Sequence, residues 1–203
     1  MKVKNSSLKT GLLASLLALM AMPSAAATLN FDFNLPATGS PSGTPPYPTV
    51  ATLEIKDIAG GVQMTLTTNW GSDGWKNQNN PAVDSLSIVM PDLSGLTASW
   101  ISGAPTKNGN GFSFGNMNLD AGYKSNAVSF KVDFQQKNKD PFDSPYLNSI
   151  WNVTGADLTT ADFENLFATA NNKPSPIFGV ISVSAYVNGN ATSSNWVAGS
   201  TPA

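Results

Sequence analysis

Residues 51–68, ATLEIKDIAGGVQMTLTT, carry the clearest structural signal in this 203-residue chain. In 53–56 and again in 62–67, every second residue is apolar and the residues between them are polar. Such strict alternation is typical of a β-strand with one buried face. Gly60 and Gly61 stand between the two alternating segments and allow the backbone conformations that a tight turn needs. We therefore predict a β-hairpin over residues 50–69.

The same alternation recurs along most of the chain. Short alternating segments, separated by connections rich in Asn, Gly and Pro, occur at residues 29–35, 86–90, 96–100, 112–114, 128–135, 150–153 and 181–187. Strands with one apolar face predict an all-β protein, and we expect an antiparallel two-sheet β-sandwich, jelly-roll-like, whose apolar faces pack together. The expected domain is a single unit over 28–203, with a flexible C-terminal end in SSNWVAGSTPA, residues 193–203.

One short helix is also expected, over TTADFENLFATA, residues 159–170. Thr159 can accept a hydrogen bond from the amide three residues later, and Asp162 stands where the second residue of a capping box belongs. Three apolar residues between 163 and 167 then fall on one face of the helix. The predicted fold is thus all-β with a single helical segment.

The first 27 residues have the features of an export signal. Lysines precede an apolar stretch at residues 12–22, and Ala25 and Ala27 occupy the small-residue positions of a cleavage site. The alternative is a membrane anchor, but the apolar run of about 11 residues is shorter than the roughly 20 that span a bilayer. We expect residues 1–27 to be removed, and the remaining protein to be secreted or held at the surface of a bacterium.

Composition excludes several kinds of chemistry. The chain has no histidine, no cysteine and no arginine. Without histidine a Ser-His-Asp triad cannot form, and without cysteine there is neither a disulfide nor a thiol nucleophile. A net charge of −2 without arginine is also unsuited to binding phosphate backbones or base edges. We therefore expect no catalytic residues and no nucleic-acid partner.

Acidic residues in loop-like sequence are candidate metal ligands. Asp140 and Asp143, in KDPFDSP, are candidates for a structural calcium site, because Ca²⁺ takes about six to eight oxygen ligands from carboxylates, carbonyls and water. The alternative is that each aspartate hydrogen-bonds within its own turn, as Asp73 and Asp84 would also do. Both interpretations stay open, and no other cofactor is expected.

A second candidate site is a sugar-binding loop. Trp70 and Trp75 flank the sequence GSDG, which contains Asp73, and Asn77 follows two residues later. Indole rings can stack on sugar faces while amides and carboxylates hydrogen-bond the hydroxyl groups. The alternative is that Trp70 ends a strand inside the core.

The two glutamates raise a third hypothesis, a glycoside hydrolase with paired carboxylates. Glu54 lies on the polar face of a predicted strand, and Glu164 lies in the predicted helix. A solvated surface charge and a partner for the helix dipole explain these positions more simply.

The order of several motifs resembles that of a bacterial protein family. The motifs are ATLEIKDIAGGVQMTLTTNW (51–70), GFSFGN (111–116), VSFKVDF (128–134), VTGADLTTADF (153–163), ISVSAYVNG (181–189) and SSNWVAG (193–199). In this order they resemble the exosortase-dependent surface proteins, the PEP-CTERM family, over residues 28–199. The resemblance implies an exported β-sandwich ectodomain in the envelope or extracellular polymer matrix, with no general enzymatic activity. The sorting tail of that family is not found after Gly199, so the resemblance implies neither sorting nor a transmembrane anchor here.

These features predict an exported, non-catalytic structural or adhesive component of the cell surface or of an extracellular (biofilm) matrix, in contact with polysaccharide or other matrix polymers. The alternative is a lectin-like carbohydrate-binding module. Self-association through exposed strand edges is a further open question. The charged residues Glu54, Lys56, Lys131 and Asp133 are those that would blunt such edges.

Overall fold

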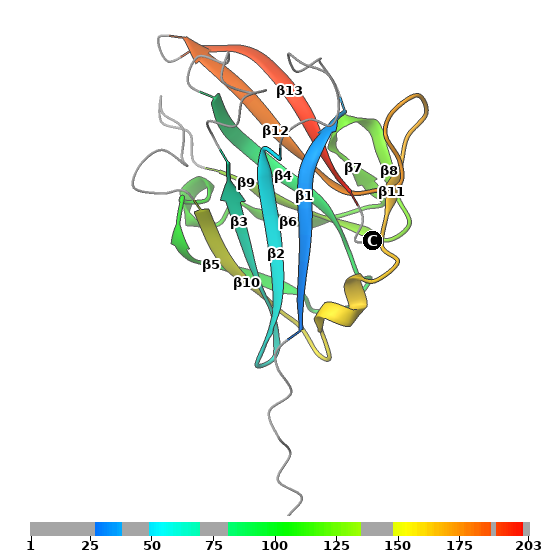
Figure 1. The fold of residues 1–203 in the computed structure, drawn as a ribbon. Coiled ribbons are helices and arrows are strands. Elements are labelled where there is room, and N and C mark those ends of the chain that lie inside the picture. Colours follow the sequence, from blue (N-terminus) through cyan, green and yellow to red (C-terminus); the bar gives the residue numbers. More distant parts are fainter. Residues whose placement is uncertain (1–26, 38–48, 70–80, 135–147, 188–189, 201–203) are drawn as a thin grey trace, which may run out of the picture.

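The computed structural model describes residues 27–37, 49–69, 81–134, 148–187 and 190–200. Strands make up 62% of the described residues, which contain no helix of seven residues or more. The strands pair antiparallel in one sheet that is nearly closed into a barrel (Figure 1). The all-β prediction is confirmed, whereas the predicted division into two separate sheets is not.

Within these described residues, thirteen strands and three short 3₁₀ turns follow one another. They are β1 (Thr28–Pro36), β2 (Ala51–Ile58), β3 (Gly61–Thr68), β4 (Pro81–Met90), β5 (Thr97–Gly103), η1 (Lys107–Gly109), β6 (Phe112–Gly115), β7 (Asn118–Leu119), η2 (Asp120–Gly122), β8 (Tyr123–Ser125), β9 (Val128–Asp133), β10 (Asn148–Thr154), η3 (Thr160–Phe163), β11 (Ala168–Thr169), β12 (Ile177–Val187) and β13 (Asn190–Ser200). Each segment predicted from alternation overlaps one of these strands.

The sheet is one continuous path with a side branch. From a first edge at β5, the order is β5-β10-β3-β2-β1-β13-β12. From β12 the path continues through β4 and β9 to a second edge at β6, while β11, β8 and β7 form the branch. The hairpin predicted over residues 50–69 is β2-β3, closed by the turn residues Ala59 and Gly60, where Gly60 has a φ of 77°. The hairpin prediction is confirmed.

Aromatic contacts across the main core hold the folded sheet together. Phe31 of β1 stacks on Phe178 of β12 with ring centroids 3.7 Å apart. Trp151 of β10 contacts Phe112 of β6 and Phe134, with centroids 6.3 and 6.4 Å apart. The Phe31–Phe178 stack spans β13, and the Trp151–Phe112 contact joins strands near opposite ends of the sheet order, so burial of the apolar face stabilises the curved form of the sheet over a flat one.

The sheet bends where β13 lies between β1 and β12. The pairing register shifts in both the β1–β13 and β12–β13 ladders, and such bulges increase local twist and bending. Gly179 of β12 pairs with Gly199 of β13. A Cβ atom at Gly179 would collide with the backbone of β4, and one at Gly199 would press against the ring of Phe33. Glycine is therefore required where the strands approach most closely.

A second apolar cluster covers the outer face of β12. Tyr123 of β8, Leu119 of β7 and Ala168 of β11 pack there against Ile177 and Val180. Because other β12 residues face the main core, this strand is buried on both faces, and its near-continuous apolar sequence follows from that position. The short branch thus acts as an outer layer over the sheet.

Residues 193–200, part of the segment that we predicted to be a flexible end, form most of β13. Its backbone pairs with β1 on one side and β12 on the other, and Val197 and Ala198 are fully buried. Small polar residues dominate this segment, so its alternation is too weak to identify a strand from sequence. Backbone hydrogen bonding to β1 and β12 therefore stabilises this strand, although its side-chain pattern does not predict one.

The helix predicted over 159–170 is wrong, apart from its first turn. The expected capping pair is present, because the Asp162 carboxylate accepts hydrogen bonds from the amide and hydroxyl of Thr159 at 2.7 and 3.0 Å. The helical turn η3 ends after Phe163, and Asn165 has a φ of 63°.

The side chain of Asn126 explains why the helix does not continue. It accepts a hydrogen bond from the amide of Phe167 at 3.0 Å and donates one to the carbonyl of Asn165 at 3.1 Å. These backbone groups are therefore not available to a helix. Ala168 then pairs with β8 and β12, so tertiary contacts override the local helical pattern.

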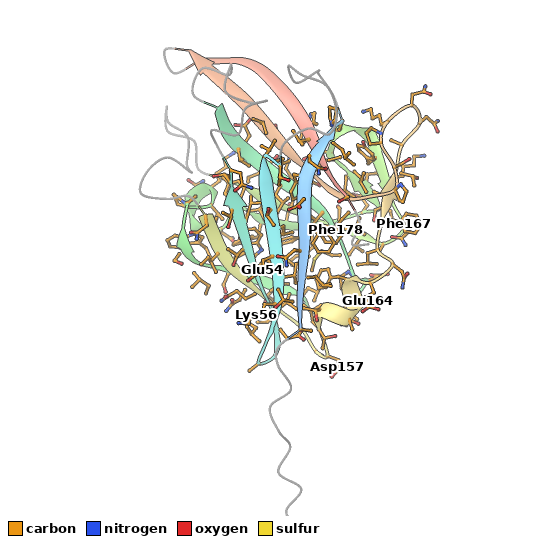
Figure 2. All side chains as sticks on the ribbon, viewed as in Figure 1. Glu54, Lys56, Asp157, Glu164, Phe167 and Phe178 are labelled. Atoms are coloured by element: carbon orange, nitrogen blue, oxygen red, sulfur yellow. The ribbon has the colours of Figure 1, made fainter. Side chains whose placement is uncertain are left out.

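Phe178 and Phe167, both labelled in Figure 2, provide a matched test of the core. Phe178 is fully buried and stacked on Phe31, whereas Phe167 is 38% exposed. We expect Phe178→Ala to lower the free energy of unfolding by about 3–5 kcal/mol, because it leaves a cavity and removes the stack. Phe167→Ala is expected to cost less than about 1 kcal/mol. Urea unfolding followed by Trp fluorescence measures both, and equal losses would contradict this description of the core.

Candidate binding site at the loop end of the barrel

The residues predicted to form sites all lie outside the described part of the chain. The sugar-binding candidates fall in residues 70–80 and the calcium candidates in residues 135–147; they are Trp70, Asp73, Trp75 and Asn77, and Asp140 and Asp143. Both sites stay predictions. The described residues that flank the two segments are nevertheless informative.

The strands that flank both segments meet at one end of the barrel. β3 precedes residues 70–80 and β10 follows residues 135–147, and Thr67 of β3 pairs with Asn148 of β10. β4 follows the first segment and β9 precedes the second, and Ser85 of β4 pairs with Asp133 of β9. We call this the loop end, defined by Thr68, Pro81, Asp133 and Asn148.

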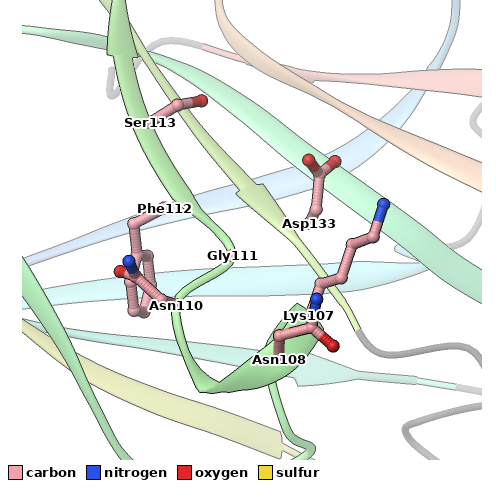
Figure 3. A pocket seen from close by; sticks show the side chains of 7 residues that line it. All are labelled: Lys107, Asn108, Asn110, Gly111, Phe112, Ser113 and Asp133. Atoms are coloured by element: carbon pink, nitrogen blue, oxygen red, sulfur yellow. The ribbon is translucent and has the colours of Figure 1, made fainter.

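A shallow pocket of about 340 Å³ lies at the loop end, between the connection after β5 and the end of β9 (Figure 3). Its lining carries an ammonium, two amides, a hydroxyl, a carboxylate and one aromatic ring; the residues are Lys107, Asn108, Asn110, Gly111, Phe112, Ser113 and Asp133. In Figure 3 the side chain of Lys107 extends in the direction of Asp133, while Asn110 and Phe112 lie on the other side of the loop. The pocket therefore offers hydrogen-bond donors and acceptors around a small apolar surface.

The sequence NGNG, residues 108–111, shapes this pocket. Asn108 and Gly109 both adopt left-handed backbone conformations, with φ of 54° and 70°, which Asn and Gly tolerate best. The Gly111 carbonyl then accepts a hydrogen bond from the Asp133 amide at 2.7 Å, which fixes the loop against β9. In the sequence, this stretch is one of the Asn- and Gly-rich connections between alternating segments, and nothing in it indicates that Asp133 would lie beside it.

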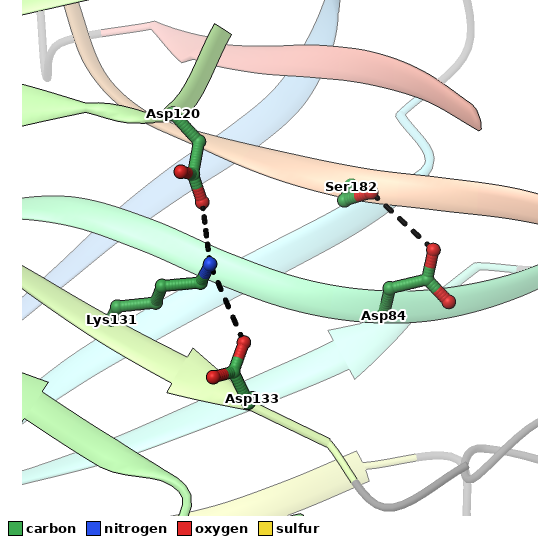
Figure 4. Close-up of polar contacts among 5 residues, drawn as sticks. All are labelled: Asp84, Asp120, Lys131, Asp133 and Ser182. Atoms are coloured by element: carbon green, nitrogen blue, oxygen red, sulfur yellow. Dashed lines mark hydrogen bonds and ion pairs between the residues drawn. The ribbon is translucent and has the colours of Figure 1, made fainter.

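Asp133 also belongs to a charged cluster on the outer face of β9. The Lys131 ammonium lies 3.1 Å from an Asp120 carboxylate oxygen and 3.5 Å from one of Asp133 (Figure 4). Burial by itself lowers the pKa of Lys131, but the hydrogen bonds and negative charges of Asp120 and Asp133 outweigh burial and raise this pKa above its usual value. The cluster ties η2 in the outer layer to β9.

Two buried polar atoms lie next to the residues that line the pocket. Thr106 Oγ1 and Trp151 Nε1 have no hydrogen-bond partner among the residues that the structure describes. Thr106 immediately precedes Lys107, and the Trp151 ring contacts the Phe112 ring. The layer behind the pocket therefore contains aromatic rings and two buried polar atoms with unused hydrogen-bonding capacity.

The paired-carboxylate hypothesis finds no support in the positions of its two residues. Glu54 is exposed midway along β2, and Glu164 is exposed just after η3, well separated from it in Figure 2. Within the described ranges, no three acidic residues gather closely enough to hold a metal ion. A carboxylate pair flanking a common substrate position is thus not formed by Glu54 and Glu164.

A smaller depression of about 220 Å³ lies at the opposite end of β5 and β6. Leu93, Leu96, Phe114 and Val128 contribute apolar side chains to its lining, and Asp92 is its charged residue. It is less suited than the loop-end pocket to a ligand rich in hydroxyl groups, because few of its side chains can hydrogen-bond.

Comparison of the chain with protein-family models, with curated proteins and with solved structures found no match. Across the part of the chain that the structure describes, no helix has the length and apolar character needed to cross a membrane. Arguments about function therefore depend on the loop-end pocket and on the sheet itself.

Stability is expected to fall as the pH rises above about 10, because two raised pKa values act in the same direction. The ordinary pKa values are 10.5 for Lys131 and 10.0 for Tyr123, and burial raises the pKa of the Tyr123 phenol. The folded protein keeps both protons to higher pH than the unfolded chain, so unfolding is favoured as the pH passes through this window.

Lys131→Met and Tyr123→Phe should each reduce the loss of unfolding free energy at alkaline pH. For Lys131, whose cluster is partly exposed, the reduction should be less than about 1 kcal/mol. Lys124→Met, which removes an exposed lysine of β8, is the control and should keep the full decline. Urea unfolding at a series of alkaline pH values measures the slope. An unchanged slope in both test variants would contradict the assignment.

Proposed function

We propose that this chain is an exported, non-catalytic structural or adhesive protein of a bacterial cell surface or extracellular matrix, and that it contacts matrix polysaccharide through the loop-end pocket. The observation that carries this proposal is the composition of the pocket. Ammonium, amide and hydroxyl groups and a carboxylate surround a single aromatic ring in an open depression. This mixture matches a polymer that presents many hydroxyl groups and small apolar ring faces.

The shape of the pocket favours a polymer over a small metabolite. A pocket that encloses a small ligand buries most of the ligand surface, whereas this one is shallow and open. Lys107 and Asp133 bring opposite charges to its lining. A neutral or weakly acidic polysaccharide therefore meets no excess of like charge.

The described carboxylates support a non-catalytic role. Glycosidases need two carboxyl groups that face each other across a scissile bond, at about 5–9.5 Å. Asp133 lies in the pocket, but its nearest charged contact is the Lys131 ammonium at 3.5 Å, which holds it as a structural ion-pair partner. The signal-like residues 1–27 support export of the protein to the cell surface.

We also infer that the folded-back sheet acts as the two-layer, jelly-roll-like sandwich expected of the PEP-CTERM-like ectodomains that the sequence resembles. The support is that both halves of the sheet contribute to one core, as in the contact of Trp151 on β10 with Phe112 on β6. Membership of that family is a proposal that rests on the order of the sequence motifs.

A lectin-like module is the second candidate function. Its predicted residues Trp70, Asp73, Trp75 and Asn77 fall in a segment whose flanking strands meet at the loop end, beside the pocket. A saturable site for a short oligosaccharide would then use this segment in place of the pocket. The two candidates differ in which substitutions abolish binding.

Affinity electrophoresis in gels that contain a neutral β-glucan or a uronic-acid polymer tests the proposal. We expect Lys107→Ala combined with Asn110→Ala to weaken retardation at least about tenfold in polymer concentration, because two hydrogen-bonding groups are lost. Asn118→Ala combined with Lys124→Ala is the matched control, since these exposed residues pair on β7 and β8, outside the pocket lining. The control should bind like the unchanged protein.

Three outcomes are decisive. Loss of retardation only in the pocket variant supports the proposed site. Loss only on Trp75→Ala would transfer the function to the lectin-like candidate. Absence of retardation in every polymer for the unchanged protein would overturn polysaccharide binding altogether.

A further inference from the structure

The charged residues that sequence analysis placed at strand edges do not lie at an edge. Glu54 and Lys56 are on β2, between β1 and β3, while Lys131 and Asp133 are on β9, between β4 and β6. The main described sheet ends at β5, with the sequence TASWISG, and at β6, with FSFG, while the two-residue β7 ends the short branch. Neither β5 nor β6 contains a charge or a proline, two of the devices that prevent edge-to-edge pairing.

β5 is the longer and more open of the two edges. Five of its seven residues are exposed, and Trp100 and Ile101 keep 39% and 47% of their surface accessible. The register with β10 shifts at Ile101, so this side chain lies at a bulge. An exposed, uncharged strand with β-branched and aromatic residues is the feature that pairs most readily with another strand.

Opposite charges flank the two ends of β5. Asp92 lies in the connection that precedes the strand, and Lys107 lies in the connection that follows it; both are exposed. Among the described residues, neither takes part in an ion pair. Antiparallel pairing of β5 with an identical strand brings Asp92 of each copy toward Lys107 of the other.

We propose that β5 pairs antiparallel with β5 of a second copy of this chain and so forms a two-fold symmetric dimer with a continuous sheet. In a two-fold symmetric contact, the same strand of each copy forms the interface. The proposed β5–β5 interface is uncharged in its middle, and at each of its ends an aspartate of one copy faces a lysine of the other. This pairing satisfies the backbone groups along the outer side of both β5 strands, which have no strand partner there among the described residues. The inference shares Lys107 with the proposed polysaccharide contact, but its evidence is the exposed edge strand and does not require that contact.

Sedimentation velocity over micromolar concentrations, on the protein purified after export, tests the dimer. Ile101→Lys places two lysines near the two-fold axis and should raise the dimer dissociation constant at least about tenfold. Thr65→Lys is the matched control, because Thr65 lies on the interior strand β3, in register with Glu54, and should leave the dimer unchanged. Urea unfolding establishes that both variants keep the fold.

A charge exchange tests the antiparallel register. Asp92→Lys alone should weaken the dimer several-fold, and Asp92→Lys combined with Lys107→Asp should restore it, since each new lysine again faces an aspartate. Restoration supports the proposed pairing. A wild-type protein that stays monomeric at every concentration, a dimer unaffected by Ile101→Lys, or a double variant no better than Asp92→Lys would each overturn it. Lys107→Asp also alters the pocket, but polysaccharide binding is measured separately and does not bear on this result.

Discussion

The bend of the sheet at β13 is the constraint on which the rest of the structure depends. Gly179 and Gly199 pair there without side chains, and a Cβ at Gly179 would strike the neighbouring strand. Because the sheet turns at this point, Phe31 and Phe178 stack across the core. The chain has no cysteine, so no disulfide reinforces this arrangement, and its stability depends mainly on packing and backbone pairing.

The strands with regular alternation could be predicted from the sequence, because apolar residues at every second position lie on the buried face of a strand. The β2-β3 hairpin is an example: both the alternation and the turn glycine are local signals. β13 escaped prediction because two neighbouring strands, rather than its own side chains, determine its conformation. The helix prediction over 159–170 failed for a related reason. Asn126, about 40 residues away in sequence, hydrogen-bonds the backbone of Asn165 and Phe167, which a helix would have used.

The candidate site shows the same limit. The NGNG sequence of residues 108–111 indicated a turn, and the alternation of β9 placed Lys131 and Asp133 on one face. No local pattern could show that Asp133 would line a pocket with Lys107, or that Asp120 would reach Lys131 from the outer layer. Those contacts are created by the pairing of β9 with β4 and β6, which is a property of the whole sheet.

The dimer and the pocket together determine what kind of adhesive the proposed protein would be. Antiparallel pairing of β5 reverses the strand direction between the two copies, so the loop end of one copy lies beside the opposite end of the other. The two pockets then face away from each other. Two sites on one side would increase the avidity for a single polymer, whereas sites at opposite ends cannot engage one short segment together. Such a dimer links separate polysaccharide chains, and weak binding at each pocket suffices, because a polymer network offers each protein many equivalent segments.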